Sequence, residues 1–215
     1  MSELDVDGEL IANTEIVESN SDILESINSC VLSSRKGIKK LDESIKKLLS
    51  HQNPKLIIIE TSGSCHPMPL IEYFKNHQSV HLKAVFALVD SLMLAHDYNY
   101  GENLITKMQE NITLNKRDTV NLLVEQIMFC SHLILTKADR IEKDKLPNIA
   151  TYIQEINPHV STHSVLFGNL KIESLFELPE YDYYKVNQLI KELKPVIELD
   201  KHDDQPYNLE TRIIK

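Results

Sequence analysis

Two polar motifs that follow short apolar runs contain the residue types that suit chemistry in this sequence. The first is Glu60, which follows the run Leu-Ile-Ile-Ile of residues 56–59 and precedes a polar turn containing Gly63. A carboxylate at the end of a buried strand can hold Mg²⁺ through water, and a glycine lets a backbone N–H approach a phosphate closely. This pattern indicates catalytic roles for Glu60 and Gly63, with Glu60 also a metal ligand through water. The alternative is an ordinary surface glutamate at the end of a strand.

The second motif is Thr136-Lys137-Ala138-Asp139, which follows the apolar run His-Leu-Ile-Leu of residues 132–135. An aspartate carboxylate can accept two hydrogen bonds from the N1–H and N2–H₂ groups of guanine, and a lysine stem can lie along the base. Adenine lacks these paired donors, so such an aspartate would select the base. The motif therefore predicts guanine binding by Thr136, Lys137 and Asp139. The alternative is that Thr136 or Asp139 caps a following helix.

Strand-like and helix-like apolar patterns alternate along the chain and predict the elements that position these motifs. Helical spacing of apolar residues predicts helices over residues 35–50, 69–75, 119–129, 145–156 and 171–176. Continuous apolar runs predict strands over residues 55–59, 82–89, 132–135 and 160–166. Residues 98–118 are compatible with a loop or a helix, and one more helix followed by a linker is expected after Pro179.

This alternation predicts an α/β fold. Strands that alternate with helices at this spacing form βαβ units, and hence a mostly parallel sheet with helices on both faces. In such sheets ligands bind beyond the carboxyl ends of the strands. Glu60 and Asp139 both follow predicted strands, so we expect the binding site at that edge of the sheet.

Three segments that occur in a fixed order resemble one protein family. They are IIIETSG, VFALVD and EQIMFCSHLILTKAD, and they resemble the CobW branch of the CobW/HypB/UreG family of P-loop GTPases, which has E-[ST]-[ST]-G, an Asp-ending strand and [NT]-K-x-D. SELDVDGELI and INPHVSTHSVLFGNL resemble two further segments of that family, the second of which closes the guanine pocket. The resemblance covers roughly residues 1–178. It implies a P-loop GTPase-like fold, GTP and Mg²⁺ as cofactors, and work as a metal chaperone or metallocentre-assembly factor on a client metalloprotein.

The family's phosphate loop, Gly-x-x-x-x-Gly-Lys-[ST], is absent from this sequence, since none of its five glycines stands in that frame. This loop supplies backbone N–H groups, a lysine and a hydroxyl to the phosphates and Mg²⁺. We therefore expect impaired nucleotide binding and hydrolysis in this chain, with GTPase activity left open. Compared with the family, residues 1–178 look like an N-terminally incomplete nucleotide-binding domain that lacks the first strand. Residues 179–215 look like a helix, a linker and the start of a truncated C-terminal domain.

Two other functions are compatible with these residues. The first is a non-catalytic interaction module, or fragment, that retains the GTPase fold. The second is a thiol enzyme that uses Cys65 with His66, which is less favoured because adjacent side chains in a turn seldom reach each other. A missing first strand would leave residues 55–59 with an unpaired apolar edge, and such edges pair with other chains. We therefore expect a homodimer, a complex with another partner, or a chain that is poorly stable in isolation.

The family's metal motif, Cys-x-Cys-Cys, is degenerate in this sequence. The resemblance places its three positions at Cys30, Leu32 and Ser33. One thiolate cannot form a Zn²⁺ site, which needs three or four nitrogen or sulfur ligands. Cys65 and His66 would be compensating metal ligands, although an ordinary turn is the simpler interpretation. Binding of Zn²⁺ or another transition metal is therefore left open.

Composition and charge narrow the class of protein. The chain has 215 residues, of which 42% are hydrophobic, and a net charge of −9, which argues against broad binding of nucleic acids. It contains no apolar run of about 18 residues, so no membrane span is expected, and its first residues lack the apolar region of a secretory signal. The three cysteines are widely spaced, which fits a reducing, cytoplasmic setting better than a disulfide framework.

Overall fold

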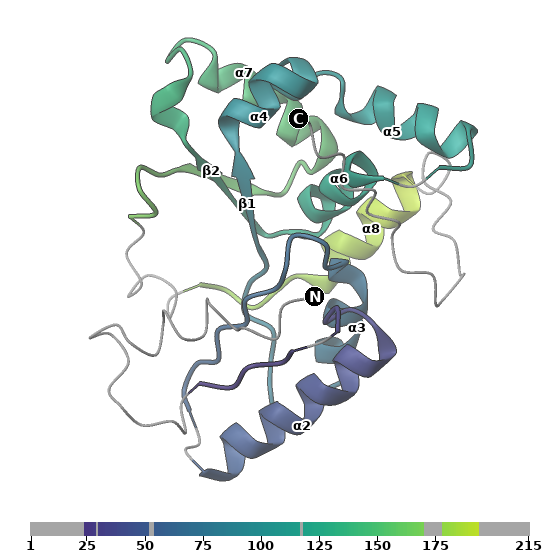
Figure 1. Ribbon diagram of the computed structural model, residues 1–215, viewed down its shortest axis with the longest axis vertical. Coiled ribbons are helices and arrows are strands. Elements are labelled where there is room, and N and C mark those ends of the chain that lie inside the picture. Colours follow the sequence, from purple (N-terminus) through teal and green to yellow (C-terminus); the bar gives the residue numbers. More distant parts are fainter. Residues whose placement is uncertain (1–23, 29, 52–53, 117, 170–177, 194–215) are drawn as a thin grey trace. The chain divides into compact units, whose positions relative to one another are not determined.

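The computed structural model describes residues 24–28, 30–51, 54–116, 118–169 and 178–193 (Figure 1). The chain divides into two compact units, Met1–Tyr73 and Phe74–Lys215. The predicted short helix over residues 171–176 lies outside the described residues, as do the N-terminal acidic stretch and the tail after residue 193.

Helix α2, Arg35–His51, is the main element of the first unit, and it confirms the helix predicted over residues 35–50. Its Leu41 and Ile45 are buried, as the helical spacing of apolar residues requires. Ser34 caps the helix, because its Oγ accepts a hydrogen bond from the backbone N–H of Gly37 at 3.0 Å. A Cβ at Gly37 would lie 2.3 Å from the carbonyl oxygen of Val31, so only glycine allows this turn to pack on the helix.

Helix α3, Pro67–Lys75, begins two residues before the predicted start, with a proline at its first position. Its Tyr73 hydroxyl donates to the carboxylate of Asp42 on α2 at 3.0 Å, which joins the two helices. The strand predicted over residues 55–59 is wrong, because residues 54–60 form no strand. A strand is stable only beside a hydrogen-bonded neighbour, and this segment has none among the described residues. Its Ile58 is 70% exposed instead of buried.

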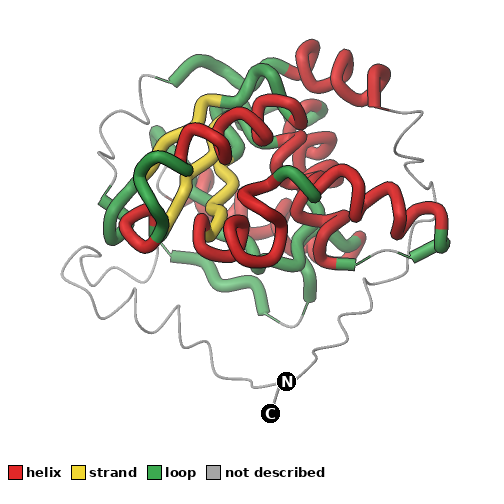
Figure 2. The backbone as a smooth tube through the Cα atoms, turned by 90° about the horizontal axis from the view of Figure 1, so that it is seen from above, coloured by secondary structure: helices red, strands yellow, loops and turns green. Residues whose placement is uncertain are grey.

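The second unit contains a parallel sheet in the order β1-β2-β3 (yellow in Figure 2). Its strands are β1, Phe86–Asp90, β2, His132–Thr136, and β3, Ser161–Ser164. Strand β2 lies in the centre, where Leu133 and Leu135 are almost completely buried. The prediction of a parallel α/β sheet with helices is therefore confirmed.

The helices of this unit are α4, Ser91–Tyr98, α5, Leu104–Thr113, α6, Thr119–Phe129, α7, Leu146–Ile156, and α8, Tyr183–Leu193, with two 3₁₀ turns, η1, Asn99–Gly101, and η2, Ala138–Arg140. Helices α6 and α7 contact each other. They belong to consecutive crossovers between parallel strands in the order β1-β2-β3. Crossovers of this kind are right-handed as a rule, which places both helices on one face of the sheet, in agreement with their contact. The two faces differ in burial, since Val89 of β1 is 2% exposed and the adjacent Leu88, which points to the opposite face, is 70% exposed.

Local patterns predicted most of these helices but fewer of the strand ends. Helix α6 has the predicted bounds, and the segment 98–118 contains η1 and α5, whereas α4 is not predicted. Strand β1 begins at Phe86 instead of residue 82, because its partner β2 begins only after α6 has ended. The carbonyl oxygen of Val85 accepts hydrogen bonds from the N–H groups of Ser131 and His132, and these are the first backbone bonds between the two segments where the strands begin.

One buried amide closes the end of α6. The Nδ2 atom of Asn157 donates to three carbonyl oxygens of that end, those of Ile127, Met128 and Cys130, at 2.9–3.1 Å. The hydroxyl of Tyr181 donates to the carbonyl oxygen of Phe129 beside them. These carbonyls have no partner within the helix, so buried side chains must satisfy them. No helix in the described part of the chain is long and apolar enough to cross a lipid bilayer.

Candidate functional site

An ion pair joins the carboxyl ends of β1 and β2. Asp90 ends β1 and lies opposite Thr136, which ends β2. The Nζ of Lys137 lies 2.5 Å from Oδ2 of Asp90. The other carboxylate oxygen accepts from the backbone N–H groups of Leu92 and Met93, at 2.9 and 3.3 Å, and so caps helix α4. Asp90 thus holds the start of α4 and the lysine of the predicted guanine motif at once.

The environment of Asp90 keeps its carboxylate charged. Burial by itself would raise its pKa, but the hydrogen bonds from Lys137 and from the amides of Met93 and Leu92 outweigh burial and leave the pKa lowered. The sequence marked Asp90 only as the acidic end of a strand. The signal for its second task was available, since aspartate before an apolar helical segment is a frequent N-cap.

The predicted guanine motif forms a tight turn after β2. Thr136 donates its hydroxyl to the carbonyl oxygen of Val89 at 3.3 Å, and Lys137 adopts the left-handed conformation with φ 53°. Ala138 is buried, whereas Asp139 is exposed at the start of η2. Neither Thr136 nor Asp139 caps a helix, since the residues that precede η2 and α7 are Lys137 and Lys145. The alternative interpretation of the motif as a helix cap is therefore wrong.

Strand β3 brings a third loop to the same edge of the sheet. The backbone N–H of Val165 donates to the carbonyl oxygen of Leu135 at 3.0 Å, which places the end of β3 beside the end of β2. Residues 166–169 then form a turn closed by a 3.1 Å hydrogen bond from Asn169 N–H to the carbonyl oxygen of Leu166. The ends of three strands thus lie at one edge of the sheet. The predicted guanine motif follows β2, and Asp90 at the end of β1 contacts its lysine.

Glu60 and Gly63 belong to the first unit, whereas the motif after β2 belongs to the second. Glu60 is exposed. It follows a segment that is not a strand, so the strand end expected there is not formed. Gly63 lies in a turn in which Cys65 N–H donates to the carbonyl oxygen of Ser62 at 2.9 Å. A Cβ at Gly63 would meet no atom within 4 Å, so packing does not require glycine at this position.

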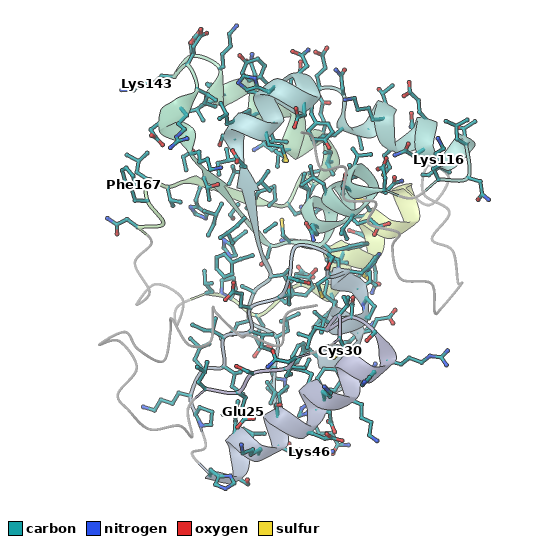
Figure 3. The ribbon with its side chains drawn as sticks, in the orientation of Figure 1. Glu25, Cys30, Lys46, Lys116, Lys143 and Phe167 are labelled. Atoms are coloured by element: carbon teal, nitrogen blue, oxygen red, sulfur yellow. The ribbon has the colours of Figure 1, made fainter. Side chains whose placement is uncertain are left out.

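The cysteines and His66 do not assemble a metal site in the described residues. Among these residues no group of three or more His, Cys, Asp or Glu side chains could hold a metal ion. Cys65 is buried, and its Sγ lies 3.8 Å from the carbonyl oxygen of His66. The backbone N–H of His66 donates to Ser33 Oγ at 3.1 Å, which ties this turn to the loop before α2. Cys30, which is labelled in Figure 3, is half-buried.

A third cysteine lies in the sheet unit. Cys130 is buried and its thiol contacts the carbonyl oxygen of Ile127 at 3.3 Å. Burial raises the pKa of this thiol to about 12, so it stays protonated and unreactive at neutral pH. Like Cys30 and Cys65, it is present as a thiol and not as half of a disulfide.

Comparison with protein families decides the relationship of the chain. A sequence model described as the CobW/HypB/UreG nucleotide-binding domain matches residues 1–164. The chain belongs to the CobW/HypB/UreG family. The match includes both motifs singled out from the sequence and ends with β3.

One curated relative of this CobW-type chain is the zinc-regulated GTPase metalloprotein activator 1 of Dictyostelium discoideum. The two are 25% identical over 220 residues, which cover 90% of this chain and 45% of the relative. The chain therefore spans about half the length of the curated relative that it matches. No solved structure matches the chain significantly.

Proposed function

We propose that this CobW-type chain binds a guanine nucleotide at the carboxyl ends of β1 and β2, as part of a GTPase that handles metal ions. The observation that carries the proposal is the ion pair between Asp90 and Lys137 beside the exposed carboxylate of Asp139. It supplies a lysine stem in a fixed place and an acceptor for the paired donors of guanine. The family relationship supports the same conclusion.

Three residues of the motif and Asp90 would have different roles in binding the nucleotide. Asp139 accepts hydrogen bonds from the base and selects guanine. Lys137 lies along the base, and Asp90 restrains it by accepting a hydrogen bond from its ammonium group. Thr136 holds the turn against β1 through its hydroxyl. Because Asp90 and Thr136 act through other groups, they are positioning residues.

Glu60 and Gly63 would serve the phosphates and Mg²⁺. Mg²⁺ prefers oxygen ligands, and the exposed carboxylate of Glu60 is a ligand of this type that would hold the ion through water. When bound, the ion would neutralise charge on the phosphates. Gly63 has open space where a side chain would stand, so a phosphate would approach its backbone closely.

Zinc does not fit in the same way, since the described residues lack a set of three ligands. We therefore assign no zinc site to Cys30, Cys65 or His66. The name of the Dictyostelium relative mentions zinc regulation and a metalloprotein. We propose on that basis that a client metalloprotein is the partner of the whole protein, in the reducing compartment that the cysteines indicate.

The test compares nucleotide binding by the wild-type chain and by Asp139→Asn. We expect weak GTP binding, with a Kd on the order of 1 mM or about −4 kcal/mol, because no Gly-x-x-x-x-Gly-Lys-[ST] frame is present in the sequence. Loss of a charged hydrogen-bond acceptor should weaken GTP binding by about tenfold or more. The amide that Asp139→Asn introduces should in turn favour xanthosine triphosphate, whose base carries a carbonyl oxygen at position 2.

Asp144→Asn is the matched control, since it makes the same change at an exposed residue outside the motif. Titrations of the protein with GTP in the presence of Mg²⁺, measured by NMR or calorimetry, should show unchanged GTP binding in this control. Tight GTP binding that is insensitive to Asp139→Asn would contradict the assignment of the site.

A further inference from the structure

The turn after β3 contains a residue that its backbone does not favour. Phe167 and Gly168 occupy the two central positions of the turn over residues 166–169, with φ values of 53° and 70°. Positive φ at both positions is the pattern of a type I′ turn, which favours Asn, Asp or Gly. A bulky aromatic residue at the first of these positions is a conformational outlier.

The ring of Phe167 is also completely open to solvent. The residue is 99% exposed, and in Figure 3 its side chain stands at the outer end of the turn. Leu166 beside it is 51% exposed. An aromatic side chain in water gains nothing from burial, so folding explains neither the residue type nor its conformation. Strained residues that folding does not explain are candidates for function.

A second strained residue lies at the same edge of the sheet. Among the described residues, five non-glycine residues have positive φ, and two of them are asparagines, which tolerate it. The other three are Tyr100, Lys137 and Phe167. Lys137 follows the last residue of β2, and Phe167 lies two residues beyond Val165, whose N–H bonds to β2. Two residues of chain span at most about 7 Å, so both strained residues lie near the proposed nucleotide site.

We propose that Phe167 stacks its ring on the nucleobase of the bound nucleotide, and this proposal rests on the function proposed above. Asp139 reads the edge of the base and Phe167 contacts its face. An exposed aromatic ring suits this contact, because every base has a π-face and stacking adds affinity without selecting the base. The left-handed turn is what projects the ring outward from the end of β3.

The experiment uses the lack of tryptophan in the chain. Phe167→Trp introduces a single indole that keeps the stacking surface, and its fluorescence should be quenched as GTP or ATP is added with Mg²⁺. Tyr184→Trp on α8 is the matched control, since Tyr184 is also a largely exposed aromatic residue. Its fluorescence should not respond to nucleotide.

Removal of the ring completes the test. Phe167→Asn suits the left-handed conformation, so the fold should be kept, as circular dichroism and thermal unfolding would verify. The variant should bind both GTP and ATP about tenfold more weakly, with the ratio between them unchanged. Binding of inorganic tripolyphosphate, which has no base, should stay the same.

The outcomes separate the two proposals. If Phe167→Asn binds nucleotides as the wild type does while Asp139→Asn loses its preference for guanine, the site stands and stacking by Phe167 is wrong. Equal quenching of the two tryptophan variants would also overturn stacking. If neither the wild type nor any variant binds a nucleotide more tightly than tripolyphosphate, the proposed function and the role of Phe167 both fail.

Discussion

Two apolar runs with the same sequence pattern have different structures. Residues 56–59 precede Glu60 in the first unit, and Leu133–Leu135 precede the guanine motif in the second. The second run is the centre of β2, with neighbours on both sides and Leu133 fully buried. The first forms no strand, and its Ile58 is 70% exposed.

The difference shows what an apolar run can determine. A run of β-branched and leucine residues favours extended backbone and burial, but its hydrogen bonds must come from other segments. β2 obtains them from β1 and β3, which belong to the same unit. The run before Glu60 obtains none from the described residues.

The largest effect should come from truncation of the central strand. Leu133→Ala removes a fully buried side chain and should lower the free energy of unfolding by about 2–5 kcal/mol. Ile58→Ala is the counterpart in the other run and should change it by less than about 0.5 kcal/mol, since the side chain is exposed. Urea unfolding curves measure both. A loss of several kcal/mol in Ile58→Ala would show that residues 56–59 are buried in a sheet after all.

Two glycines extend the comparison to the turns. Gly37→Ala would force a Cβ against backbone carbonyls and should destabilise the chain by about 1–3 kcal/mol. Gly63→Ala, in the turn after Glu60, meets open space at a residue without positive φ, so stability should be unchanged. Thermal unfolding of the two variants is the measurement. Equal destabilisation would mean that the turn at Gly63 is closely packed.

The next effect concerns the end of β1. Asp90→Ala removes the N-cap of α4 and the partner of Lys137, and should lower stability by about 1 kcal/mol. Asp90→Asn keeps a capping oxygen and loses only the charge, so its effect should be smaller.

The stability of Asp90→Asn should also differ from that of the wild type in its dependence on acid pH. Because the pKa of Asp90 is lowered in the folded chain, its contribution is complete above the unfolded value of about 3.9 and is lost as pH falls through the folded value. Unfolding measured between neutral and acidic pH should show this loss in the wild type and not in Asp90→Asn. The same acid dependence in both would contradict the assignment to Asp90.

The smallest effect should come from a histidine on the more exposed face of the sheet. His132 lies between Phe86 and His163, with ring centroids 5.0 and 5.7 Å away, and its Nδ1 lies 3.4 Å from Nε2 of His163. Burial and the facing His163 lower its pKa. The neutral ring therefore stabilises the fold above the unfolded pKa of about 6.5, and this contribution is lost as pH falls through the folded value.

His132→Phe keeps a ring beside Phe86 and should flatten this dependence in unfolding experiments near pH 6. His163→Gln removes the facing imidazole and should reduce the same dependence in part. A wild-type stability that does not vary in this pH range would exclude a contribution from His132.

The sequence by itself determined the features that depend on neighbouring residues in the chain. Helices α2, α6 and α7 follow from the spacing of apolar side chains, which a helix repeats every few residues. The family relationship and the position of Thr136–Asp139 after a buried strand were also readable, because they depend on residue order alone. Burial of β2 follows from its continuous apolar run.

Only the tertiary structure decided which segments found partners. The first residue of β1 depends on where β2 begins. The segment before Glu60 forms no strand because it has no neighbouring strand among the described residues. The pair of Asp90 with Lys137 joins residues 47 positions apart, and Asn157 closes a helix 27–30 positions away. No local pattern encodes such contacts, because their hydrogen bonds form only when the chain has brought distant segments together.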